Sequence, residues 1–237
     1  MLANRLRGLA LILGLGLAWQ APSPARAEVL SLTPDEALMT ARAAYLAGDV
    51  AVAVDVTAAV SAGSSVTLHR LTVSTQAGTH AECSRHVRDD APALDELALS
   101  AFLGECEVRD VRAARERVLP ADVLDRLPAR VERVLLRTLQ HSDWERWPEG
   151  FTALAPELID ALAARGCRLI GTDAPSIDPQ TCTALRSHHA AHRAGMAILE
   201  GLVLDHITEG RYELIALPLP VTGIEATPVR AVLREFM

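Results

Sequence analysis

Lysine is absent from this 237-residue chain, so all 23 of its basic residues are arginine. This absence excludes a Schiff-base lysine and the phosphate-binding loop that ends in Gly-Lys-Ser/Thr. Aromatic residues are also scarce, with 3 Trp, 2 Tyr and 3 Phe, and the formal net charge is −7. The chain therefore lacks the basic, stacking-rich surface that binds nucleic acid, and we expect no nucleic-acid partner.

The four cysteines contain no Cys-x-x-Cys pair, which excludes a zinc ribbon and a thioredoxin-like redox site. In an oxidising compartment, Cys83, Cys106, Cys167 and Cys182 could pair in three ways, and the sequence does not choose among them. Cys106 and Cys167 fall in stretches that resemble strands, so we expect them to be buried free thiols.

Long apolar runs are missing apart from the segment of about Leu9 to Trp19, which is too short to span a bilayer as a mature helix. Arg5 and Arg7 precede this segment, and the small-x-small sequence Ala25-Arg26-Ala27 follows it. This order predicts a secretory signal peptide over residues 1–27. We therefore expect an exported protein, periplasmic or secreted, that is not held in a membrane after cleavage.

The remaining sequence is typical of a folded protein, because half of all residues are hydrophobic. Residues 28–50 are predicted to form an N-terminal helical segment, in which Thr33-Pro34-Asp35-Glu36 begins a helix that Gly48 ends. Residues 51–237 are predicted to form one catalytic domain, since no internal linker or repeat interrupts them.

Strand and helix patterns alternate along this domain, which favours an α/β fold with a mixed β-sheet and flanking helices, of a swivelling β/α/β-like type. The hydrophobic patterns and their flanking turn residues predict strands and helices. The expected strands cover residues 50–60, 66–75, 105–111, 131–138, 167–172, 212–217 and 229–233, and the expected helices cover 121–127 and 156–165.

Polar side chains that could bind a metal occur at even positions between Gln76 and His86. In an extended segment, Gln76, His80, Glu82 and His86 would project from one face. Gln76 and His80 would then lie roughly 13 Å apart, too far to share a metal, so the chain must bend at Gly78. His80 and Glu82 can form half of a metal site without a bend. The alternative is a polar strand edge with two incidental histidines.

The segment Gly78–His86 resembles the metal motif H-x-G-T-H-x-D-x-P-x-H of the kynurenine formamidase-like cyclase family. Three later stretches also resemble this family in their order and spacing: Gly166–Pro179, His188–Leu202 and Tyr212–Arg234. The resemblance covers about residues 55 to 237.

This resemblance implies a metal-dependent amidohydrolase that holds zinc or manganese. By position, the implied ligands are His80, Glu82, His188 and Glu200, and His86 is the implied general acid/base. A bound zinc lowers the pKa of water to about 7, which suits cleavage of an amide C–N bond. The implied reaction is an arylformamidase step of tryptophan catabolism, from N-formylkynurenine to kynurenine and formate, by a homodimer. An exported location fits such a cytoplasmic step poorly.

Two departures from the family motif bear on activity. Gln76 stands where the family has its first histidine, and Glu82 replaces an aspartate. A neutral amide is a weaker ligand than imidazole, so we expect Gln76 to be a weak metal ligand or a donor that orients water or substrate. The family's aromatic segment before the motif is also missing. The alternative to an enzyme is an exported, non-catalytic protein that binds a metal or a ligand at a degraded site.

The second half of the implied site requires a break in the chain. In one continuous helix, His188 and Glu200 would lie roughly 18 Å apart along the axis and could not share a metal. We therefore predict a helix from about His188 that ends at Gly195, with a return through Met196 to Leu199. The competing pair, His188 and His192, has helical spacing but lacks the glutamate of H-E-x-x-H. Asp173 and Asp178 flank the loop before this helix, and we expect this loop to support the site.

Overall fold

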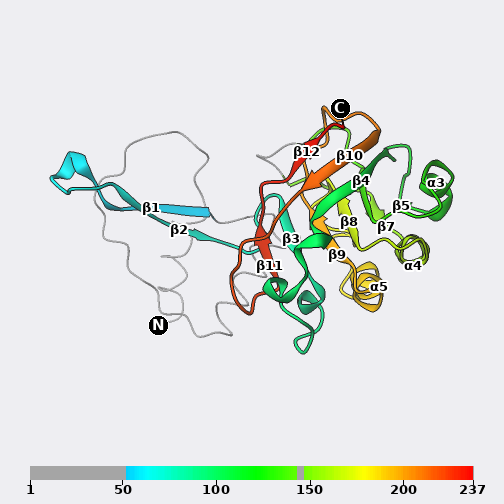
Figure 1. Cartoon of the computed structure of the whole chain (residues 1–237), viewed down its shortest axis with the longest axis horizontal. Helices are drawn as coiled ribbons and strands as arrows, with labels where there is room; N and C mark the ends of the chain where they lie inside the picture. The colour runs from blue at the N-terminus through cyan, green and yellow to red at the C-terminus, as the bar shows by residue number, and fades with distance from the viewer. Residues whose placement is uncertain (1–51, 143–146, 237) are drawn as a thin grey trace. The chain divides into compact units, whose positions relative to one another are not determined.

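The computed structural model describes residues 52–142 and 147–236, so the predicted signal peptide and the helical segment 28–50 lie outside the described residues. The chain divides into two compact units, Met1–Ser74 and Thr75–Met237. Figure 1 shows the elements of each unit with their labels. All the candidate site residues belong to the second unit.

The first unit contains an antiparallel hairpin. Its strands β1 (Val52–Ala58) and β2 (Leu68–Val73) are joined through a short 3₁₀ turn, η1 (Val60–Ala62). Both strands match the predictions made from their alternating, β-branched sequences. A β-bulge lies between Val56 and Ala58 and shifts the register of the pair.

The second unit is built on an eight-stranded sheet with the order β11-β3-β9-β8-β6-β4-β10-β12. The pairs β4–β6, β6–β8 and β8–β9 are parallel, and the other pairs are antiparallel. The predicted α/β class with a mixed sheet is confirmed. The strands are β3 (His80–Glu82), β4 (Leu103–Asp110), β6 (Arg133–Arg137), β8 (Leu169–Thr172), β9 (Ala197–Glu200), β10 (Gly210–Ile215), β11 (Ala226–Pro228) and β12 (Val232–Arg234).

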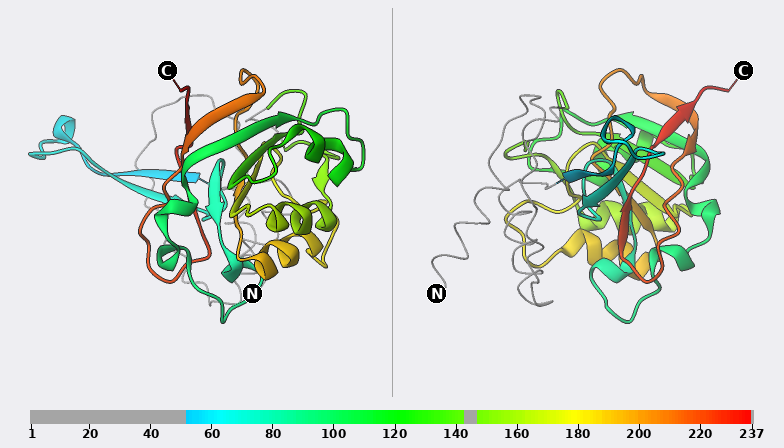
Figure 2. Two further views of the ribbon diagram at one scale, coloured as in Figure 1. Left: turned by 45° about the vertical axis from the view of Figure 1, so that its right-hand side comes forward. Right: turned by 90° about the vertical axis from the view of Figure 1, so that its left-hand side faces the viewer.

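Two nine-residue helices, α4 (Pro156–Ala164) and α5 (Arg186–Ala194), pack beside each other against this sheet (Figures 1 and 2). Pro156 begins α4. Its missing backbone N–H costs nothing there, because the first N–H groups of a helix have no partner within the helix. The shorter elements are α3 (Pro120–Val123), β5 (Arg117–Val118), β7 (Ala153–Leu154), η2 (Ser84–His86), η3 (Leu94–Glu96), η4 (Leu99–Ala101) and η5 (Leu124–Arg126). None of the helices in the described parts of the chain is long and apolar enough to cross a membrane.

The two faces of the sheet have separate hydrophobic cores, because successive side chains of a strand point to opposite faces. Val134 and Leu136 of β6 join the core that includes α4 and α5, whereas Leu135 between them joins the core on the other face. Strand β9 divides in the same way: Ile198 packs on the face of α5, and Leu199 packs on the opposite face. A side chain's position in its strand therefore decides whether it faces α5.

The predicted break after α5 is confirmed. Gly195 adopts the left-handed conformation with φ 60°, and the backbone N–H of Met196 donates to the carbonyl of Ala191. Such a C-cap favours glycine, since its missing Cβ removes the steric penalty of positive φ. The returning segment is strand β9, which the sequence patterns did not identify as a strand.

All four cysteines are free thiols, so no disulfide constrains the fold. Cys106 and Cys167 are buried, as expected, and burial raises the pKa of each thiol to about 12. Thiols with such pKa values stay protonated at neutral pH and are poor nucleophiles or metal ligands. These two residues contribute to packing rather than to chemistry.

Candidate metal centre

Strands β3 and β9 bring together residues that are 120 positions apart in sequence. They pair antiparallel, with His80 opposite Glu200, and Nε2 of His80 lies 3.4 Å from Oε2 of Glu200. Ala81 packs in the core on the far face, so alternation directs His80 and Glu82 to the same face as Glu200 and α5. All three polar side chains are buried, with 2%, 0% and 1% of their surface exposed.

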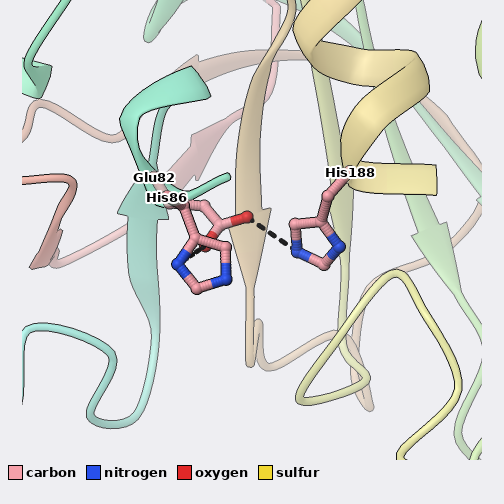
Figure 3. Close-up of side chains that lie close together, drawn as sticks. All are labelled: Glu82, His86 and His188. Carbon is pink, nitrogen blue, oxygen red and sulfur yellow. Dashed lines mark ion pairs between the residues drawn. The ribbon is translucent and has the colours of Figure 1, made fainter. Parts of the chain in front are cut away.

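Helix α5, which packs on this face of the sheet, supplies the fourth polar side chain, His188. His188 is buried, and its Nε2 lies 3.0 Å from Oε1 of Glu82 and 3.5 Å from Oε1 of Glu200. Figure 3 shows its imidazole reaching from α5 toward the Glu82 carboxylate of β3. Three elements therefore converge on one small buried region that contains two imidazoles and two carboxylates.

Neighbouring groups fix the orientation of both imidazoles. Oδ2 of Asp178 lies 2.8 Å from Nδ1 of His188, and Asp178 also accepts the backbone N–H groups of Ser187 and His188. The carbonyl of Gly78 lies 3.0 Å from Nδ1 of His80. In each ring, Nδ1–H donates outward, which leaves Nε2 facing the carboxylates. This arrangement is typical of histidines that bind metals.

The ligand-bearing segments meet at a contact that only glycine allows. Gly201 directly follows β9 with φ 63°, and a Cβ there would lie 2.6 Å from the carbonyl oxygen of Gly78. The hydroxyl of Thr79 donates to the Gly201 carbonyl over 2.6 Å. The backbone N–H of Ile177 also donates to Oε1 of Glu200 over 2.7 Å. These contacts hold both strand ends and the loop before α5 in one place.

His86 lies at the more accessible side of this cluster. It ends η2, its side chain is 26% exposed, and its ring centroid lies 5.3 Å from that of His188. Nδ1 of His86 is 3.9 Å from Oε2 of Glu82 and 2.7 Å from Nε2 of Gln76 (Figure 3 shows His86 with Glu82 and His188). His86 can therefore contact a molecule that enters from this side.

The buried carboxylates shift the pKa values of the imidazoles. Burial alone would lower the pKa of His80 and of His188, but the adjacent Glu200 and Glu82 carboxylates outweigh it and raise both pKa values. Burial would likewise raise the pKa of Glu200, but the two neighbouring histidines lower it. The region therefore favours positive charge, and a divalent cation would compete with protons for the same atoms.

The donor atoms fit such a cation. Two groups have ligand atoms within 4.8 Å of one another: His80 with Glu82 and Glu200, and Glu82 with His86 and His188. Nε2 of His80 and both carboxylate oxygens of Glu82 are buried without a hydrogen-bond partner. Burying polar atoms unpaired is costly, and a cation held by these residues would reduce that cost. Imidazole and carboxylate together suit zinc or manganese.

The structure thus brings together His80, Glu82, His188 and Glu200, with His86 beside them and Gln76 in contact with His86. His192 belongs to neither of the two groups. The sequence placed Asp178 in a supporting loop but gave no sign that its partner is His188, because ten residues and a turn separate them. The contact between Gly78 and Gly201 could not be inferred, since it depends on strand pairing.

Comparison with known proteins agrees with this fold. The family model named Cyclase, with the description "Putative cyclase", matches residues 20–179, which is more than half of the chain. The protein belongs to the Cyclase family.

Solved structures share its fold. Isatin hydrolase A from Labrenzia aggregata, bound to benzyl benzoate, is 23% identical with a TM-score of 0.68, and the match covers 98% of each chain. A protein described as a predicted metal-dependent hydrolase from Bacillus stearothermophilus is 25% identical with a TM-score of 0.66. That match covers 77% of this chain and 86% of the other.

Proposed function

We propose that this protein is a hydrolase that uses a divalent cation to cleave an amide C–N bond. The observation that carries the proposal is the buried cluster of His80, Glu82, His188 and Glu200, in which Nε2 of His80 and both carboxylate oxygens of Glu82 have no hydrogen-bond partner. Family membership supports it, as does the fold shared with isatin hydrolase, whose name indicates action on a cyclic aryl amide.

The four buried side chains would hold the cation, with Asp178 and Gly78 fixing the two imidazoles. A divalent cation at such a site acidifies water and polarises the carbonyl of the substrate. The protein's own contribution is the geometry: Nε2 of each imidazole is directed inward, and the surrounding core excludes bulk water.

His86 is the group that we assign to proton transfer. It lies beside the cluster, with Nδ1 3.9 Å from Oε2 of Glu82, and remains partly exposed, so its ring can contact an entering substrate. An imidazole ring can accept a proton and return it, which is why histidine is the commonest general acid/base. In amide hydrolysis, His86 would take a proton from the attacking water and deliver it to the departing nitrogen.

The proposal also includes the kind of amide that the protein hydrolyses. N-formyl aryl amides such as N-formylkynurenine, and cyclic aryl amides such as isatin, are the two candidates. We also propose that the protein acts after export, with zinc or manganese as its cation, and as a homodimer. Mass spectrometry of the mature N-terminus tests export, and light scattering of the purified protein tests the homodimer.

A substrate screen with matched variants tests the function. The wild-type protein is loaded with zinc or manganese, its cation content is measured, and turnover of N-formylkynurenine, isatin and simple N-formyl anilines is followed. Glu200→Gln removes a buried ligand, and Glu157→Gln makes the same change at an exposed position on α4. We expect near-stoichiometric cation and turnover in the wild type and in Glu157→Gln, and loss of both in Glu200→Gln.

The opposite result favours the binding-protein alternative. If the wild type takes up the cation but hydrolyses none of the amides, the protein uses the cluster to bind rather than to cleave. If it takes up no cation after reconstitution, the proposed function is wrong as a whole.

A further inference from the structure

Gln76 contacts the residue that we assign to proton transfer. Its Nε2 lies 2.7 Å from Nδ1 of His86, which is a short hydrogen bond between two side chains. Gln76 is half-buried, two residues before the bend at Gly78 (φ 61°) that leads into β3. The amide is thus held by the backbone next to the metal-binding strand while its nitrogen faces His86.

This hydrogen bond determines where the His86 ring carries its proton. An amide N–H₂ group can only donate, so Nδ1 of His86 must accept, and the proton of the neutral ring is then on Nε2. After rotation of the amide, its oxygen could accept from a protonated Nδ1 instead. Gln76 can therefore remain bonded to His86 in each of the protonation states through which a general acid/base passes.

A ligand at position 76 could not do this. A glutamine whose oxygen is bound to a cation cannot rotate its amide to turn that oxygen toward His86, and a histidine has no group that offers a donor and an acceptor side by side. The cluster also does not require a further ligand, because His80, Glu82, His188 and Glu200 already supply the three or four side chains that zinc sites use.

We propose that Gln76 is a positioning residue for His86 and not a ligand of the cation. It sets the orientation and the tautomer of His86, and the cation is held by the four buried side chains alone. This inference rests on the proposed function for the role of His86, but its first two tests need no turnover.

The test uses Gln76→Met, which keeps the length of the side chain and removes both its donor and its acceptor. Gln140→Met is the matched control at an exposed position after β6. Three quantities are compared in zinc-loaded protein: the cation affinity, the nitrogen and proton signals of the His86 imidazole in ¹⁵N NMR, and kcat and KM on any amide that the wild type hydrolyses.

We expect the cation affinity of Gln76→Met to stay within about twofold of the wild type. The His86 signals should change from a single Nε2–H tautomer to a mixture, because the bond to Nδ1 is lost. Since general acid/base catalysis contributes about 10² to 10⁴ in rate, a misplaced His86 should lower kcat about tenfold or more, with little change in KM. Gln140→Met should match the wild type in all three.

Two results would overturn the proposal. One is a cation affinity that falls by more than about tenfold in Gln76→Met alone, which would make Gln76 a ligand. The other is an unchanged His86 spectrum, which would show that Gln76 does not set the tautomer. If the wild type hydrolyses no amide, the proposed function fails, but the affinity and the spectrum still decide the role of Gln76.

Discussion

Oδ2 of Asp178 lies 2.8 Å from Nδ1 of His188, and both side chains are almost fully buried. Burial would raise the pKa of Asp178, but its bonds to the His188 imidazole and to two backbone N–H groups lower it instead. The carboxylate is therefore charged at neutral pH, and it holds the proton of His188 on Nδ1. Nε2 is then the ring atom from which a cation would displace a proton, so Asp178 would orient a ligand without touching the metal.

We predict that Asp178→Asn weakens cation binding about 10- to 100-fold, as is common for the partners of metal-binding histidines. An amide can donate to Nδ1 and so place the ring proton on Nε2, where it blocks coordination. Isothermal titration with zinc measures the effect. The control is Asp160→Asn on the exposed side of α4, which should bind like the wild type. Equal affinity of Asp178→Asn and wild type would contradict this role.

The contact between Gly201 and Gly78 allows a test of strand placement. Ala at Gly201 would introduce both an unfavourable φ and a Cβ 2.6 Å from the Gly78 carbonyl oxygen, whereas Ala at Gly195 introduces a similar φ with open space around it. We predict that Gly195→Ala costs about 1 to 2 kcal/mol of unfolding free energy. Gly201→Ala should cost more and should weaken cation binding as well. Urea unfolding and zinc titration of both variants check this, and equal effects would show that the contact is not tight.

Glu82 links cation binding to thermal stability. Both of its carboxylate oxygens are buried without hydrogen bonds, so we expect a cation to raise the melting temperature of the wild type markedly. In Glu82→Gln this rise should be largely lost, and the cation-free protein should melt below the cation-free wild type, because the buried pair of Glu82 and His188 is broken. Differential scanning calorimetry with and without a chelator measures both. A full cation-dependent rise in Glu82→Gln would remove Glu82 from the ligand set.

Arg133 is a buried charged residue that stabilises the fold away from the metal centre. Its guanidinium donates to the carbonyls of Ala101 over 2.8 Å and Glu105 over 3.0 Å, and burial lowers its pKa. We predict that Arg133→Met lowers the unfolding free energy by about 3 kcal/mol, because these carbonyls lose their partner.

The control for this change is Arg130→Met, whose side chain is 82% exposed and should change stability little. Both variants should bind zinc with wild-type affinity while folded. Stability is followed by urea unfolding monitored by circular dichroism, and a loss of zinc affinity in folded Arg133→Met would show that the two regions are coupled.

The longer elements could be predicted because local sequence determines them. The N-terminal Pro156 and the apolar face of α4 specify its start and its packing side, and Gly195 ends α5 where the chain must turn. The parallel strands β6 and β8 contain the apolar runs 134–136 and 169–170, as expected for strands that are buried on both faces.

The short strands could not be predicted from patterns. Strands β3 and β11 have three residues each, which is too few for a periodic signal, and β9 has four. They are stabilised by pairing with one another across long sequence distances. The metal centre could likewise be predicted only in part. The motif around His80 indicates a metal site, but the short distance from His80 to Glu200 follows only from the pairing of β3 with β9.

Because β3 lies between β9 and β11, the cation centre depends on segments that follow β3 at a long distance in the sequence. Both β9 and β11 must be synthesised before β3 can complete its pairing. Cation capture would then follow this long-range pairing, and it would draw on whatever metal the surrounding compartment offers at that moment. For side chains that accept several divalent ions, local supply rather than intrinsic affinity would then select the metal that the mature protein carries.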